Sequence, residues 1–174
     1  FGMRPEARGL DLYVRRVLIQ SKNKDLIPEY LGFVRGVVDT EDLPLNISRE
    51  TLQENILIRK ISSTLTKQVL AHLKKLSQDK DRYAKFWKEH AKRFKLGYTD
   101  FANQEAFGEL LRFNSSRHPT REELLSLDEY IEAAKAGQKE IYYISGPSRE
   151  AIEQNPHLEI FRAKGLEVLY LYEP

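Results

Sequence analysis

The strongest constraint on the fold lies in the middle of the chain, where apolar residues recur every three or four positions. This spacing places them on one face of an α-helix, whereas a strand would alternate at every second position. Ser77 to Asp81 interrupts the pattern and offers Asp79 or Asp81 as the N-cap of a second helix. We therefore predict two long helices between residues 54 and 96, whose apolar faces the flanking segments must cover. These faces contain Ile58, Ile61, Leu65, Val69, Leu73 and Leu76, then Tyr83, Phe86, Trp87 and Phe94.

The segment before the helices contains two stretches typical of β-strands. Leu10 to Ile19 alternates apolar with charged residues, and Val34 to Asp39 is rich in valine. Between them, Pro28 to Phe33 predicts a short helix, with the proline in its first turn. Two strands do not make an independently stable sheet. Residues 1–54 are therefore expected to be the end of a larger α/β/α sheet domain whose other strands lie elsewhere.

The segment after the helices begins with further helical signals. Asp100 is placed to cap a helix that runs to about Arg112. Two serine or threonine residues are each followed three positions later by glutamate, the spacing of a capping box, in which the two side chains bond each other's backbone amides. These pairs are Thr120 with Glu123 and Ser126 with Glu129. Each pair predicts the start of a helix.

The last part of the chain predicts a small α/β/α unit. The apolar runs Ile141 to Ser145 and Leu166 to Leu171 are joined by a helical pair over Ser148 to Lys164. Apolar strands connected through helices indicate a short parallel sheet. The predicted fold class is therefore α/β, in three parts: residues 1–54, a helical connector at 55–97 and a small α/β unit at 98–174.

Composition excludes several classes of function. The net charge is +2, and charged residues make up 31% of the chain, which indicates a surface of mixed sign. The lysines of the two long helices are interleaved with acids, so nucleic-acid binding ranks last among the hypotheses. No apolar run approaches the roughly 20 residues of a membrane span. The chain has no cysteine and its four histidines lack zinc-site spacing, so neither a membrane nor a metal is expected.

The aromatic pair Phe86 and Trp87 has two interpretations. It can form an exposed docking patch for unfolded proteins, or it can belong to the core. Aromatic residues at helical spacing are usually core residues, so we favour the second interpretation.

A candidate site lies in the segment between Gly36 and Gln53. Ser48 has the character of an N-cap, and Arg49 would follow it in the first turn of a helix. A cation there is slightly unfavourable, because the helix N-terminus already carries partial positive charge. With Asn46 and Gln53, Arg49 forms a polar trio suited to phosphate oxygens. The alternative is a solvated Arg49 paired with Glu50 or Asp42, and the sequence alone favours this alternative.

Several motifs closely resemble the middle segment of the heat shock protein 90 chaperone family. The motifs are residues 12–19 (LYVRRVLI), 25–31 (DLIPEYL), 35–53, 110–115 (LLRFNS), 141–146 (IYYISG) and 165–169 (GLEVL). The resemblance covers nearly the whole chain, except the loop from Arg117 to Leu125 and the extreme ends. Phe1 is not an initiator methionine, so both ends look like cut points within a longer protein.

The resemblance implies a role in ATP hydrolysis for the candidate site. ATP and Mg would be held by a separate N-terminal domain, and Arg49 would contact the terminal phosphate with Asn46 and Gln53 in support. The isolated fragment would then bind no cofactor and hydrolyse nothing. The alternative is a non-catalytic protein-interaction scaffold with no nucleotide role.

The resemblance also implies partners and a compartment. The partners would be the N-terminal ATPase domain, client proteins and co-chaperones, and dimerisation would belong to a C-terminal domain, which leaves the fragment monomeric. Residues 17–22 (VLIQSK) resemble the mitochondrial branch, whereas residues 100–106 (DFANQEA) resemble the bacterial branch. The expected location is the cytoplasm, with the mitochondrial matrix as the alternative.

Overall fold

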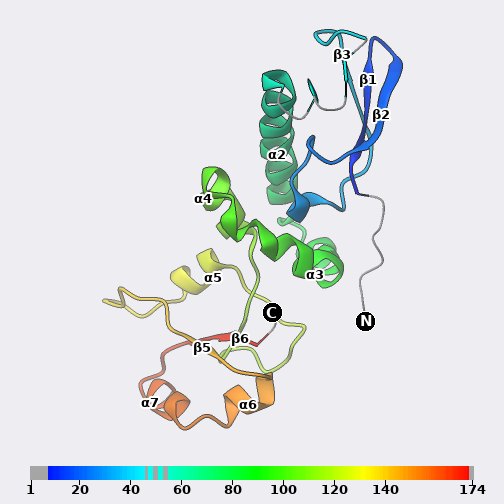
Figure 1. Ribbon diagram of the computed structural model, residues 1–174. Helices are drawn as coiled ribbons and strands as arrows, with labels where there is room; N and C mark the ends of the chain where they lie inside the picture. The colour runs from blue at the N-terminus through cyan, green and yellow to red at the C-terminus, as the bar shows by residue number, and fades with distance from the viewer. Residues whose placement is uncertain (1–7, 46, 49–50, 53–54, 173–174) are drawn as a thin grey trace. The chain divides into compact units, whose positions relative to one another are not determined.

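The chain folds into two compact units, Phe1–Gln104 and Glu105–Pro174 (Figure 1). The computed structural model describes residues 8–45, 47–48, 51–52 and 55–172. Each unit combines helices with a small sheet, so the predicted α/β class is confirmed. No helix in these described ranges is long and apolar enough to cross a membrane.

The first unit contains a three-stranded sheet in the order β2-β1-β3. Its strands are β1 (Leu10–Val14), β2 (Val17–Asn23) and β3 (Val37–Thr40). The central strand β1 runs antiparallel to β2 and parallel to β3. The three inward residues of β1, Leu10, Leu12 and Val14, are buried, so this strand contributes to the core of the first unit.

The prediction of a single strand from Leu10 to Ile19 is wrong, because the chain reverses within it. Arg15 and Arg16 form a two-residue turn with φ values of 48° and 66°. Such left-handed pairs match the twist of the flanking strands, but they are normally built from asparagine and glycine. Two arginines are not typical turn residues, so the alternation of apolar and charged residues gives no indication that the chain reverses here.

The two long helices are α2 (Ile56–Leu76) and α3 (Lys80–Phe94), which confirms the prediction from periodicity. Asn55 caps α2 by accepting a hydrogen bond from the Leu57 amide at 2.8 Å. Asp79 caps α3 in the same way through the Arg82 amide at 3.1 Å. Ordinary side-chain caps thus fix both helix starts.

Helix α3 packs against the short 3-10 helix Glu29–Leu31 through aromatic rings. The rings of Tyr30 and Phe94 lie 5.9 Å apart at 70°, an edge-to-face contact. The Tyr30 hydroxyl also donates to the Asp100 carboxylate at 2.7 Å, and Asn103 donates to the same oxygen at 2.9 Å. The predicted helix is present as the 3-10 helix Phe101–Asn103 followed by α4 (Gln104–Leu110), and Asp100 stands at its N-cap position. The Asp100 side chain makes no cap hydrogen bond, however, because its carboxylate is occupied by Tyr30 and Asn103.

The second unit contains a smaller sheet in the order β4-β6-β5. Strands β5 (Tyr143–Ser145) and β6 (Leu169–Leu171) are parallel, as predicted, and β4 (Asn114–Ser115) joins β6 antiparallel. The helices of this unit are α4 (Gln104–Leu110), α5 (Leu127–Glu132), α6 (Arg149–Glu153) and α7 (His157–Ala163). The pair α6 and α7 confirms the helical crossover between the parallel strands.

The two predicted capping boxes have different outcomes. Ser126 and Glu129 form a complete box at the start of α5, with the Glu129 amide donating to Ser126 Oγ at 3.1 Å. Thr120 and Glu123 also bond each other, at 2.9 Å between hydroxyl and carboxylate, but no helix follows. The backbone after Glu123 is used instead in a bridge between Leu125 and Phe113, with two 2.9 Å hydrogen bonds.

Candidate functional site

The predicted site residues Asn46, Arg49 and Gln53 lie outside the described residues, so their contacts stay a prediction. The structure does describe the segments on either side of them, between β3 and α2. These flanks determine how the loop is attached to the first unit.

Ser48 acts as the predicted helix cap. Its hydroxyl accepts a hydrogen bond from the Thr51 amide at 3.3 Å, and its carbonyl accepts one from the Leu52 amide at 3.0 Å. Thr51 and Leu52 are helical, and the two hydroxyls of Ser48 and Thr51 lie 2.7 Å apart. Ser48 therefore has the hydrogen bonds of an N-cap to the described helical residues Thr51 and Leu52.

Two leucines anchor this loop in the core of the first unit. Leu43, before the candidate residues, is 3% exposed, and Leu52 among them is 2% exposed. Between these anchors Pro44, Leu45 and Ser48 are exposed. Burial of two leucine side chains contributes roughly 2 kcal/mol each, which is enough to hold both ends of a short loop.

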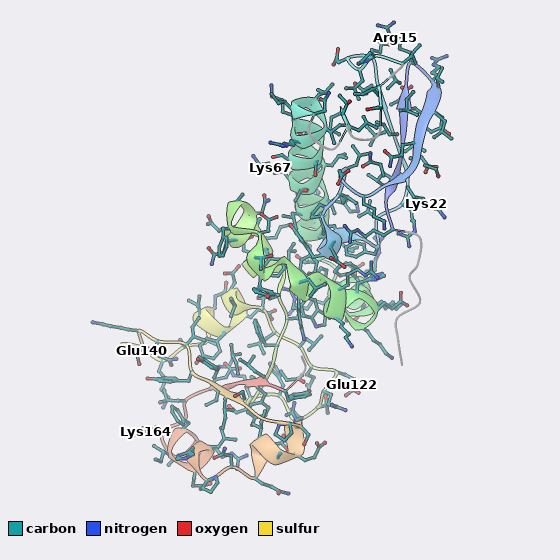
Figure 2. The ribbon with its side chains drawn as sticks, in the orientation of Figure 1. Arg15, Lys22, Lys67, Glu122, Glu140 and Lys164 are labelled. Carbon is teal, nitrogen blue, oxygen red and sulfur yellow. The ribbon has the colours of Figure 1, made fainter. Side chains whose placement is uncertain are left out.

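The turn between β1 and β2 lies beside the start of this loop. The Arg15 amide donates to the Thr40 carbonyl at 3.1 Å, and the Arg16 amide donates to the Asp39 carboxylate at 3.2 Å. Both arginines are exposed, and Figure 2 shows Arg15 at the end of the sheet from which the loop departs. The sequence pattern does not indicate these two cations, because the predicted strand runs through them.

Two further polar segments form no site geometry. Glu41 and Asp42, which follow β3, are exposed, and the described part of the chain holds no group of three or more side chains suited to a metal. At the turn Ser145–Ser148, Ser148 caps α6 through the Ala151 amide at 3.1 Å, which makes this an ordinary strand-to-helix connection.

The aromatic residues of α3 belong to the core of the first unit. Trp87 is 5% exposed, and its ring lies 6.2 Å from that of Phe94. Phe86 is half-buried, with the rings of Phe33 and Tyr83 at 5.1 and 5.3 Å. The core interpretation is confirmed for Trp87, whereas Phe86 lies at the edge of the same cluster.

The lysines of the long helices form a solvated surface. Lys67, Lys74, Lys75, Lys80, Lys85, Lys88 and Lys92 are all exposed. Figure 2 shows Lys67 projecting from α2. Asp81 and Glu89 lie among the lysines of α3, whereas α2 contains no acidic residue, so acids separate the cations only in the second helix.

Comparison with known proteins gives a family model and several relatives. The model described as Hsp90 protein matches residues 2–174. Chaperone protein HtpG of Nitratidesulfovibrio vulgaris is 65% identical over 175 aligned positions, which cover 100% of this chain and 28% of the relative. The protein of the same name from Legionella pneumophila is 48% identical, with coverage of 94% and 26%. That from Wolinella succinogenes is 45% identical, with coverage of 95% and 26%. The chain thus spans little more than a quarter of the length of these relatives.

Proposed function

This chain belongs to the Hsp90 family, and on that premise we propose that it works as one segment of an ATP-dependent molecular chaperone. The relatives that it matches are named chaperone proteins, which supports a role in the folding of client proteins. The relatives named above are bacterial, so they support a cytoplasmic location and lend no support to the mitochondrial alternative.

The proposed chemical contribution of the chain is one arginine. ATP would be bound by another domain of the full protein, and Arg49 would approach its terminal phosphate when the two domains close. The guanidinium then stabilises the negative charge that develops as the phosphoryl group passes to water. Asn46 and Gln53 have side-chain N–H donors that suit phosphate oxygens, and they would position the loop.

The observation that supports this proposal is the anchoring of the described residues that flank Arg49 in the sequence. Ser48 caps the helix start, and the leucines Leu43 and Leu52 hold the loop in the core. An arginine supplied from outside a nucleotide pocket must be pre-positioned, because a freely rotating side chain would lose conformational entropy at every turnover. A loop anchored at both ends reduces that cost.

The test compares ATP hydrolysis and ATP binding in the full-length protein with Arg49→Ala. Arginines supplied in this way contribute about 10³ to 10⁵ in rate in other phosphoryl-transfer systems, which we take as a ceiling. Because domain closure can limit turnover, we expect a loss of kcat of at least about tenfold, with ATP binding nearly unchanged. Arg59→Ala is the matched control, since Arg59 is an exposed arginine in the first turns of α2.

Unchanged turnover in Arg49→Ala would refute the phosphate role. The chain would then be a scaffold that binds proteins without acting on nucleotide. The remaining proposed partners are the N-terminal domain of the same protein, client proteins and co-chaperones. Homodimerisation would require a C-terminal domain, so the chain by itself should be monomeric. It should also not hydrolyse ATP by itself, because the nucleotide would be bound by the separate N-terminal domain.

A further inference from the structure

The second unit contains a pocket of about 270 Å³ that has no part in the role proposed for Arg49. It lies between the end of α5, the loop that follows α5 and the turn after α7. Its lining includes three cations, Arg117, Lys135 and Arg162, whereas Glu167 is the single acidic residue among the lining residues. The lining therefore has an excess of two positive charges.

Arg117 is held in place by a buried carboxylate. Its Nη2 lies 2.7 Å from Glu167 Oε2, and the Glu167 side chain is only 7% exposed. No N–H of the guanidinium points along a good hydrogen-bond direction to this oxygen, so the contact is an ion pair without an aligned hydrogen bond. The other carboxylate oxygen accepts from Ser115 Oγ at 2.6 Å. Glu167 is thus fixed, and it fixes the guanidinium in turn.

The other two cations are also tied to the backbone. The Lys135 ammonium donates to the Lys164 carbonyl, and Arg162 Nη2 reaches the Glu153 carbonyl at 3.5 Å. The Lys135 ammonium also packs closely against Gly165, where a Cβ would lie 3.0 Å from it. Each cation keeps further N–H donors for a ligand, since arginine has five and lysine three.

The wall of the pocket is rigid at Tyr130. The ring is 1% exposed, and its hydroxyl donates to the Glu167 carbonyl at 2.8 Å. The same hydroxyl accepts hydrogen bonds from Gln138 and from the Tyr142 amide, at 3.1 and 3.0 Å. The three segments that surround the pocket are therefore joined through one side chain. A site of this kind loses little conformational entropy when a ligand binds.

We propose that this pocket binds a small organic dianion, either a dicarboxylate or a phosphate monoester. Its two uncompensated positive charges match two negative charges on the ligand, and guanidinium groups suit carboxylate and phosphate oxygens alike. Its volume lies below the roughly 300 to 1,000 Å³ of sites for drug-sized ligands, which limits the ligand to a small molecule. The apolar atoms of Ala133, Ala134 and Leu166 provide a surface for a short carbon chain.

The test is isothermal titration of the full-length protein with succinate, inorganic phosphate and acetate in separate experiments. We expect saturable binding of succinate or phosphate at one site per chain, and much weaker binding of the monoanion acetate. The dianion that binds more tightly identifies the ligand class. Arg162→Gln should weaken that binding by about tenfold or more, because it removes a charge-assisted hydrogen bond.

Lys139→Gln is the matched control, since Lys139 is an exposed cation of the same unit that does not line the pocket. Lys139→Gln should leave the affinity for the dianion unchanged. Arg49→Ala should also leave it unchanged, so the dianion pocket and the proposed role of Arg49 in ATP hydrolysis can be tested separately. If Arg162→Gln and Lys135→Gln both still bind the dianion with wild-type affinity, the anion binds elsewhere and the proposal is wrong. Absence of saturable binding of both dianions would overturn it as well.

Discussion

Removal of a single oxygen atom in Tyr130→Phe should destabilise the second unit strongly. Phenylalanine fills nearly the same space, so the change creates no cavity. It removes the hydroxyl that is hydrogen-bonded to the Glu167 carbonyl, the Gln138 side chain and the Tyr142 amide. Gln138 is half-buried and can turn toward water. The Tyr142 amide and the Glu167 carbonyl are fixed in the backbone and stay without a partner. At about 1 to 2 kcal/mol for each such group, the expected loss of stability is about 2 to 4 kcal/mol.

Hydrogen exchange measured by mass spectrometry is the appropriate assay. The two units can open separately, so one global transition would not report on the second unit alone. Exchange of peptides within residues 127–145 and 164–172 should accelerate in Tyr130→Phe, with the Tyr142 amide among the first to lose protection. Tyr143→Phe is the control, because Tyr143 is 68% exposed on β5 and its change should stay within about 0.5 kcal/mol. Equal exchange in the two variants would refute the reasoning.

Two further predictions concern the first unit. Replacement of Arg15-Arg16 by Asn-Gly should stabilise the β1–β2 turn by about 1 kcal/mol, because both positions have positive φ. Hydrogen exchange of the β1 and β2 amides should then slow down, and faster exchange would contradict this prediction. Burial, and next the Asp100 carboxylate, raises the pKa of the Tyr30 hydroxyl above its ordinary value. The folded state therefore keeps this proton longer than the unfolded state, and the associated stability is present below about pH 10 and is lost as pH rises through the folded pKa. Urea titrations between pH 9 and pH 11 should show a steeper loss for wild type than for Tyr30→Phe, and parallel curves would exclude the effect.

Local signals predicted the helical part of the fold well. The boundaries of α2 and α3 follow from apolar periodicity and from polar residues at the caps, and both kinds of signal depend only on near neighbours in sequence. The capping box at Ser126 succeeded for the same reason. The equal spacing at Thr120 failed because the next residues pair with Phe113, and sequence spacing does not encode that tertiary contact.

The functional sites were predictable to different degrees. The loop around Arg49 stands out because a capped helix start with a cation is a local pattern, and the structure confirms its cap at Ser48. The pocket of the second unit gives no sequence signal. Arg117, Lys135 and Arg162 are far apart along the chain and converge only after α5 and α7 have packed.

Strand β6 occupies the centre of its sheet but follows both of its neighbours in the chain. During synthesis, β4 and β5 must therefore wait without a strand partner until β6 has left the ribosome. Contacts between segments so distant in sequence form slowly, because a long loop must close before any hydrogen bond compensates for it. The second unit should accordingly assemble in one late step rather than strand by strand, and a chain stopped before Leu169 should expose two unpaired edges to aggregation.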